Sequence, residues 1–183
     1  MGHPMIIRQA TTGDAQGIAR VHVDVWRTTY RGVITDDVLA NLSYERREQQ
    51  WREAAGRSGE GGRSLFVAED AGRIVGFASG GPERTGDALY KGELYAIYVL
   101  QTSQGQGIGR LLVHQVGKAL VSAEISTMLV WVLAANRGAR HFYEVLGGRF
   151  LKEQPVELPG VTLPEVAYGW DNLPSLISML TSG

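Results

Sequence analysis

The feature that most constrains this fold is a cluster of three glycines between a predicted strand and a predicted helix. Residues 93–100 are typical of a strand, and Gln104-Gly105-Gln106-Gly107-Ile108-Gly109-Arg110 follows it. Apolar residues then recur at helical spacing over residues 108–120. A helix N-terminus has unpaired amides and a partial positive charge, and glycines let a phosphate approach the main chain. The turn therefore predicts either a phosphate-binding site or a tight connection without a ligand.

Two common phosphate-binding motifs do not fit this turn. A dinucleotide fingerprint needs a glycine five residues after the first, and Arg110 stands five residues after Gly105. A Walker A loop needs Gly-Lys-Ser/Thr, but Gly117-Lys118 is followed by Ala119. These mismatches disfavour an unrelated nucleotide-binding α/β protein.

The rest of the chain alternates between strand and helix patterns. Thr12 is the expected N-cap of the first helix, and a hairpin is expected around residues 70–73. Strands are expected over residues 5–9, 65–68, 74–77, 93–100, 128–133, 150–156 and 161–168. Helices are expected after residue 12, after residue 35, and over residues 43–51, 108–120, 137–146 and 173–180. This order predicts an α/β protein with a mixed sheet and helices on both faces.

Composition limits the possible partners and chemistry. A chain of 183 residues with 44% hydrophobic residues is expected to form one domain, and its net charge of -1 lacks the basic excess of proteins that bind nucleic acid or anionic membranes. The absence of cysteine excludes disulfides, thiolate metal sites and a cysteine nucleophile. No apolar run approaches the roughly 20 residues that span a bilayer, and no leader pattern is seen, so a cytoplasmic location is expected.

The turn resembles the Gln/Arg-x-x-Gly-x-Gly/Ala signature of the GNAT N-acetyltransferase superfamily, with Gln104, Gly107 and Gly109 at its fixed positions. Residues 93–99 resemble the fourth strand of that family, and residues 131–143 resemble its fifth strand and following helix. The resemblance implies a GNAT fold, in which a splayed pair of parallel strands holds acetyl-CoA. The resemblance extends over roughly residues 5–170, so we expect the domain over residues 5–171 and a tail over residues 172–183. The residues before Met5 are expected to be a remnant or a disordered start, residues 1–4.

The resemblance further implies a set of cofactor-binding residues. The pantetheine arm would pair with the main chain of Ile97, Tyr98 and Val99, and Asn136 would hydrogen-bond the same arm. The turn would hold the pyrophosphate through Gln104, Gly105, Gln106, Gly107, Ile108, Gly109 and Arg110. The Arg110 side chain has two interpretations, as a cation near the phosphates or as a solvated group in the first helical turn.

Acetyl transfer to an amine requires removal of a proton, because an ammonium has no lone pair. A lysine-like amine of pKa about 10.4 is neutral only about once in 2,500 at pH 7. Glu93 lies eleven residues before Gln104, where the resemblance implies a base that acts directly or through water. Strand alternation is expected to place Glu93, Tyr95, Ile97 and Val99 on one face. The alternative for Glu93 is a solvated carboxylate at the strand end.

Tyr143 resembles the family's tyrosine acid, which protonates the departing thiolate. The alternative is a core tyrosine on an amphipathic helix. Trp26 and Tyr30 are one helical turn apart, so they line a substrate pocket or pack the helix on the sheet. His22, His114 and His141 lack metal-like spacing and are interpreted as surface or core residues.

These observations predict an acetyl-CoA-dependent N-acetyltransferase. A small-molecule or peptide primary amine would attack directly in a ternary complex, with no metal and no covalent enzyme intermediate. A non-catalytic acyl-CoA-binding or sensing domain of the same fold is the alternative. Exposed strand edges allow a homodimer.

Overall fold

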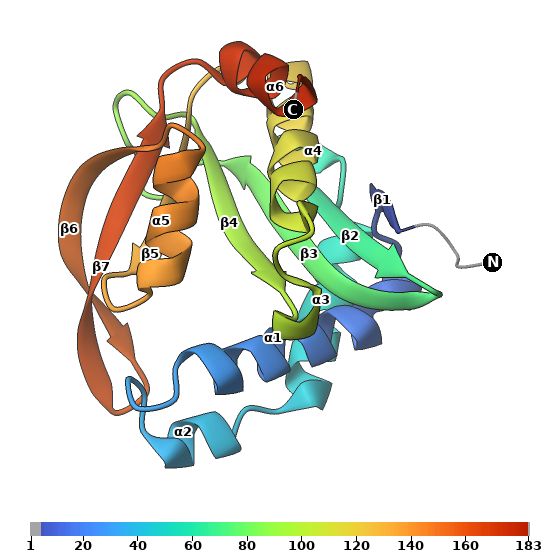
Figure 1. Cartoon of the computed structure of the whole chain (residues 1–183), viewed down its shortest axis with the longest axis vertical. Helices are drawn as coiled ribbons and strands as arrows, with labels where there is room; N and C mark the ends of the chain where they lie inside the picture. Colours follow the sequence, from blue (N-terminus) through green and yellow to red (C-terminus); the bar gives the residue numbers. More distant parts are fainter. Residues whose placement is uncertain (1–4, 183) are drawn as a thin grey trace.

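The computed structural model describes residues 5–182 and contains a seven-stranded sheet of order β1-β2-β3-β4-β5-β7-β6 (Figure 1). The expected remnant, residues 1–4, lies outside the described residues. The strands are β1 (Ile6–Gln9), β2 (Ser64–Asp70), β3 (Arg73–Pro82), β4 (Gly92–Val99), β5 (Met128–Leu133), β6 (Arg149–Leu158) and β7 (Val161–Trp170). The pair β4 and β5 is parallel, and the remaining neighbours are antiparallel. The predicted mixed sheet is therefore confirmed.

Helices cover both faces of the sheet, as predicted. They are α1 (Ala15–Thr29), α2 (Asp36–Ala40), α3 (Tyr44–Gly56), α4 (Ile108–Ser122), α5 (Arg137–Val145) and α6 (Leu173–Thr181). Apolar residues of α1 and α3 form one buried cluster with β2 and β3, and those of α4, α5 and α6 form a second cluster on the opposite face. A third cluster joins the end of α1 and the α2 region to β5, β6 and β7. These three clusters surround the point where β4 and β5 separate.

The start of α1 differs from the sequence expectation. Thr12 is not its N-cap, because residues 12–14 form a short 3₁₀ turn and α1 begins at Ala15. The Asp14 carboxylate accepts from the Thr11 amide at 2.7 Å and from the Arg8 guanidinium at 2.8 Å. These bonds hold the 3₁₀ turn ahead of the helix, and they lower the pKa of Asp14 to about 2, with the Arg8 hydrogen bond as the main cause.

A bulge in β4 changes which face its side chains occupy. Gly80 pairs with Leu94 and Ser79 pairs with Ala96, so Tyr95 is an extra residue. Ile97 then joins Leu94 and Val99 in the cluster beside α4, while Ala96 and Tyr98 pack beside α1. The expectation that Glu93 and Tyr95 share a face with Ile97 and Val99 is therefore wrong, because strict alternation fails at a bulge.

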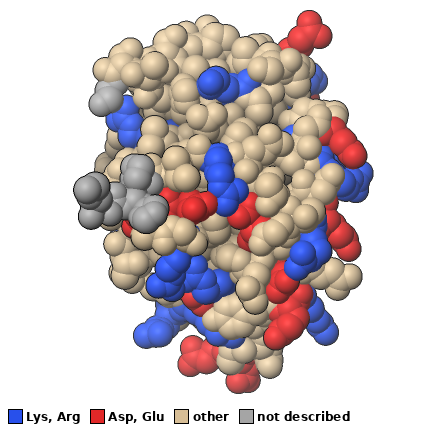
Figure 2. Space-filling view, turned by 90° about the vertical axis from the view of Figure 1, so that its right-hand side faces the viewer, with Lys and Arg blue, Asp and Glu red and all other residues tan. Residues whose placement is uncertain are grey.

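The C-terminal segment is part of the main core. Leu173, Leu176 and Leu180 are buried in the same cluster as α4, so α6 belongs to the domain and is not an appended tail. Over residues 5–182, no helix combines the length and apolar character needed to cross a membrane. Acidic and basic side chains are interspersed on the face shown in Figure 2.

Candidate active site

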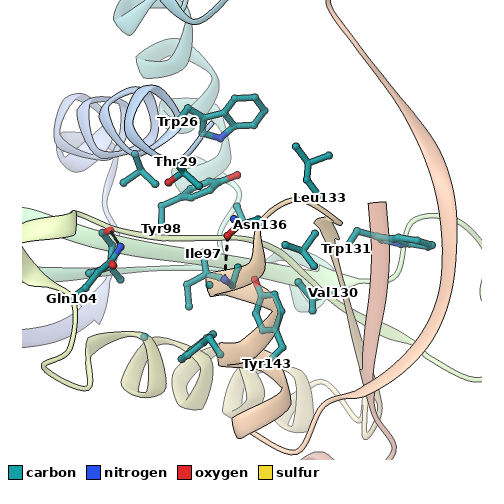
Figure 3. Close-up of a pocket in the computed structure, with 18 of the residues that line it drawn as sticks. Trp26, Thr29, Ile97, Tyr98, Gln104, Val130, Trp131, Leu133, Asn136 and Tyr143 are labelled. Atoms are coloured by element: carbon teal, nitrogen blue, oxygen red, sulfur yellow. Dashed lines mark hydrogen bonds between the residues drawn. The ribbon is translucent and has the colours of Figure 1, made fainter. Parts of the chain in front are cut away.

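A cavity of about 740 Å³ lies where β4 and β5 diverge. These two strands are in register only from Gly92 to Leu94 and from Met128 to Val130, which leaves Tyr95–Val99 unpaired on the β5 side. The cavity is lined by α1, β4, the turn before α4, β5, α5 and the β6–β7 hairpin. Figure 3 shows Trp26 and Tyr98 on one side of it and Tyr143 on the other. The predicted splayed strand pair is thus present and encloses a cavity.

One end of the cavity is formed by the N-terminus of α4. Gly107 is the N-cap, so α4 begins without a capping side chain, whereas Ser43, Asn136 and Asn172 cap α3, α5 and α6 through side-chain oxygens. The first α4 bond runs from the Leu111 amide to the Gly107 carbonyl, so the amides of residues 108–110 have no intrahelical acceptor. These amides can bind an anionic group.

The glycines of this turn have distinct structural reasons. Gly107 has φ 79°, and a Cβ there would meet nothing within 4 Å, so its requirement is conformational and leaves open space beside the cavity. At Gly109 a Cβ would lie 3.0 Å from the Phe142 ring, so this glycine permits the close approach of α4 and α5. Gly105, Gly107, Ile108, Gly109 and Arg110 line the cavity, and Gln106 does not.

The middle of the cavity exposes main-chain groups of β4. Ile97, Tyr98 and Val99 line it, and their unpaired side can accept an extended ligand as an additional strand. Gln104 also lines the cavity, and its side-chain amide donates to the Val99 carbonyl at 3.1 Å. The signature glutamine therefore ties the end of β4 to the glycine turn.

Asn136 links two walls of the cavity. Its Oδ1 accepts from the Ala139 amide at 3.1 Å and caps α5, and its Nδ2 donates to the Tyr30 hydroxyl at 3.3 Å. Asn136 and Tyr143 both line the cavity (Figure 3). Both Oδ1 and Nδ2 of Asn136 therefore have a partner within the protein. The hydrogen bond from Asn136 to a cofactor arm stays a prediction.

Tyr143 is a buried phenol beside the separated strands. Its side chain comes from α5, is 4% exposed and lines the cavity. Burial raises the pKa of Tyr143 above its ordinary range, and the neighbouring Tyr98 and Tyr30 phenols act in the same direction. Tyr143 is therefore protonated at neutral pH and can donate a proton.

Glu93 lies apart from the residues that line the cavity. It is 2% exposed, and its carboxylate accepts from the Arg84 guanidinium at 2.7 and 3.2 Å and from the Arg84 amide at 3.2 Å. Arg84 in turn packs over the Tyr95 ring at 4.2 Å, and Tyr95 does line the cavity. The structure thus brings Tyr143, Asn136 and the turn together without bringing Glu93 into the same cavity wall.

The second end of the cavity is built from side chains of distant segments. Trp26 and Tyr30 both line it, with ring centroids 4.9 Å apart, and Tyr30 is also part of a buried cluster. Trp26 and Tyr30 therefore line the cavity and also pack α1 against neighbouring apolar residues. The opposite walls consist of Trp131 and Leu133 from β5, Val156 and Leu158 from β6, and Glu165 from β7. No local motif identifies the β6 and β7 residues, because only tertiary packing brings the hairpin against α1.

The histidines occupy core or surface positions, as interpreted. His22 is buried, stacks on Tyr98 with ring centroids 5.2 Å apart and accepts from the Trp51 indole at 2.9 Å. Burial lowers the pKa of His22 to about 3. His114 lies next to Thr181, and His141 is exposed on α5. None of the three lines the cavity.

The chain is similar in sequence to a known protein family. The profile described as "Acetyltransferase (GNAT) family" matches residues 23–147. A Bacillus subtilis (strain 168) protein named "Uncharacterized N-acetyltransferase YuaI" is 41% identical over 175 residues, covering 95% of this chain and 97% of the relative.

Two solved structures share the fold. The PaiA N-acetyltransferase from Thermoplasma acidophilum, solved in complex with coenzyme A, has a TM-score of 0.74 at 17% identity and covers 92% of this chain and 100% of that chain. YncA from Salmonella typhimurium, described as a putative acetyltransferase with its cofactor acetyl-CoA, has a TM-score of 0.70 at 23% identity. The match covers 93% of this chain and 95% of that chain.

Proposed function

Because the chain belongs to the GNAT family of acetyltransferases, we propose that it transfers the acetyl group of acetyl-CoA directly to a primary amine in a ternary complex. One observation supports this most strongly. A single cavity joins the uncapped N-terminus of α4 to an aromatic pocket formed by Trp26, Tyr30 and Trp131. Two substrates can therefore reach each other within one cavity.

The cofactor-binding groups in this proposal are mainly main-chain groups. Amides of residues 107–110 hold the pyrophosphate, with Arg110 as an adjacent cation, and the free side of Ile97, Tyr98 and Val99 pairs with the pantetheine arm. Acetyl-CoA supplies a thioester carbonyl that is open to attack by a nitrogen lone pair. A main-chain amide of β4 polarises that carbonyl.

Tyr143 supplies the proton for the leaving sulfur. The amine nitrogen forms the new C–N bond, the C–S bond breaks, and the Tyr143 hydroxyl donates its proton to the departing thiolate. The proton that the acylated nitrogen loses restores the Tyr143 phenol. Burial keeps the Tyr143 hydroxyl protonated at neutral pH, so the proton is present when negative charge develops on the sulfur. No covalent enzyme intermediate is needed.

Removal of the amine proton is assigned to Glu93 acting through water. Its carboxylate is paired with Arg84 outside the cavity lining, so a water chain past Tyr95 is the form of base catalysis that fits this position. Trp26 and Tyr30 hold the acceptor and limit access of bulk water.

The proposal is tested by mixing the purified protein with acetyl-CoA and a panel of amines and measuring free CoA with a thiol reagent. The chain has no cysteine, so the protein itself does not react with this reagent. We expect acetyl-CoA to raise the melting temperature and CoA release to depend on the amine. A raised melting temperature without release for any amine would instead support the acyl-CoA-binding alternative.

A further inference from the structure

Of the described residues that line the cavity, two have acidic or basic side chains, and they come from different walls. Arg110 stands in the first turn of α4, at the end that suits phosphates. Glu165 stands on β7, at the end lined by Trp26, Tyr30 and Trp131. The remaining lining residues are neutral. Among the residues that line the acceptor end, Glu165 is therefore the one with a charged side-chain type, and none is basic.

Glu165 is held in place without being neutralised. The Gln154 side-chain amide donates through Nε2 to Glu165 Oε1 at 2.9 Å across the β6–β7 pair. None of the salt bridges formed within residues 5–182 involves Glu165. The nearby Lys152 ammonium lies 5.7 Å from the centre of the Trp131 ring and is paired with Asp87 at 2.9 Å. A half-buried carboxylate thus faces the cavity with capacity for a cationic partner.

The position of Glu165 separates it from the transfer site. Glu165 is in register with Leu133, the last residue of β5, and β5 is itself a wall of the opening beside β4. Neighbouring strands are about 4.8 Å apart, so Glu165 lies one strand beyond that wall. At this distance Glu165 can contact a second group of the acceptor, several ångströms from the nitrogen that attacks the thioester, more readily than that nitrogen itself.

The surfaces between these two points are aromatic and aliphatic. Trp131 and Leu133 lie on the β5 side, and Trp26 and Tyr30 face them from α1. Such walls favour an apolar chain, and aromatic faces also attract a cation. A carboxylate carried by the acceptor would instead be repelled by Glu165.

We propose, on the basis of the transfer function above, that the acceptor is a primary amine with an apolar spacer and a second cationic group, and that Glu165 binds this second cation. Glu165 is then the residue that determines acceptor specificity. The chemical class is a diamine or a longer amine that contains a diamine unit.

A matched acceptor series tests this proposal. It consists of an alkyl monoamine, the diamine of the same chain length and the ω-amino acid of the same chain length, each assayed by CoA release at several chain lengths. A charge-assisted contact predicts that kcat/KM for the diamine exceeds that for the monoamine by roughly tenfold to hundredfold. The ω-amino acid is expected to be the poorest acceptor.

Variants assign the preference to the carboxylate. Glu165→Gln should bring the diamine-to-monoamine ratio of kcat/KM towards one, and Glu165→Lys should favour the ω-amino acid. Glu165→Asp keeps the charge and should keep part of the preference. Glu153→Gln is the matched control, because Glu153 is an exposed carboxylate of β6 that does not line the cavity, and its ratio should equal that of the parent.

The outcomes separate this inference from the proposed function. CoA release with all three acceptors but no diamine preference would overturn the role of Glu165, as would a Glu165→Gln variant with the parental ratio and an intact acetyl-CoA melting shift. No release by the parent protein with any amine would overturn the transfer function itself, and the acceptor class with it.

Discussion

The two ends of the cavity are built in different ways. The α4 end consists of consecutive residues of one turn, and its polar groups are main-chain amides exposed by glycines. The acceptor end consists of side chains from α1, β5, β6 and β7, which are brought together by packing. A main-chain site depends on local conformation and tolerates few residue types, whereas a side-chain site can change its chemistry by single substitutions. The difference explains why the local sequence identifies the α4 end, but at the acceptor end identifies only Trp26 and Tyr30 of α1.

The largest expected effect is the loss of cofactor binding at the main-chain end. Gly107→Glu adds a carboxylate beside the free amides at a position with φ 79°. Acetyl-CoA at one hundred times its dissociation constant should stabilise the parent by about 2.7 kcal/mol and the variant not at all. Thermal melts with and without acetyl-CoA measure this difference.

Gly72→Glu is the matched control for backbone strain. Gly72 has φ 77° in the turn between β2 and β3, with open space around it, and it does not line the cavity. This variant should lose intrinsic stability and keep the stabilisation by acetyl-CoA. An undiminished acetyl-CoA shift in Gly107→Glu would show that the turn is a tight connection without a ligand.

The next effect concerns Tyr143, which lies where the two ends meet. Tyr143→Phe removes the hydroxyl and keeps the buried ring, so the melting temperature should change little. If the hydroxyl protonates the leaving sulfur, kcat falls by about 10²–10⁴-fold while acetyl-CoA affinity is nearly constant. Parental turnover at saturating substrates, with chemistry limiting the rate, would leave Tyr143 as a core residue.

A smaller effect is expected at Glu93, outside the cavity lining. Glu93→Gln should lower turnover by about 10²-fold at neutral pH, with partial recovery as rising pH deprotonates the free amine. A pH–rate profile from pH 6 to 9 measures this. If the variant and parent rates agree across that range while the melting temperature of the variant drops, the ion pair between Glu93 and Arg84 stabilises the fold and takes no part in catalysis.

The smallest expected effect is a pH dependence of stability caused by His22, which stacks on Tyr98 of the cavity wall. The folded pKa of His22 is depressed to about 3, so below pH 6.5 the unfolded chain binds a proton that the folded chain does not. The free energy of unfolding should fall as pH falls below about 7, and well above pH 6.5 His22 contributes no pH dependence. The contribution is at most about 1.3 kcal/mol between pH 7 and pH 5.5.

Urea unfolding of His22→Gln against the parent isolates this contribution. The variant keeps a possible acceptor for the Trp51 indole and lacks the titrating group. Its stability should depend less on pH between 7 and 5.5 than that of the parent. Identical dependence would mean that His22 is not held neutral by the aromatic cluster.

The sequence alone determined the elements whose signals are local. The strand at residues 128–133 matches β5, Thr35 immediately precedes α2, and the glycine turn precedes α4 as predicted. Hydrophobic periodicity and the conformational freedom of glycine act within a few residues, so they can be read without knowledge of the partner segments.

The tertiary structure decided what depends on pairing between distant segments. The register of β3 against β4 creates the bulge at Tyr95 and moves Ile97 and Val99 to the α4 face. Pairing with Arg84 keeps Glu93 out of the cavity lining, and packing of the β6–β7 hairpin brings Glu165 into it. Side-chain burial and charge pairing follow from which strands and helices meet, and no local pattern in this chain specifies those meetings.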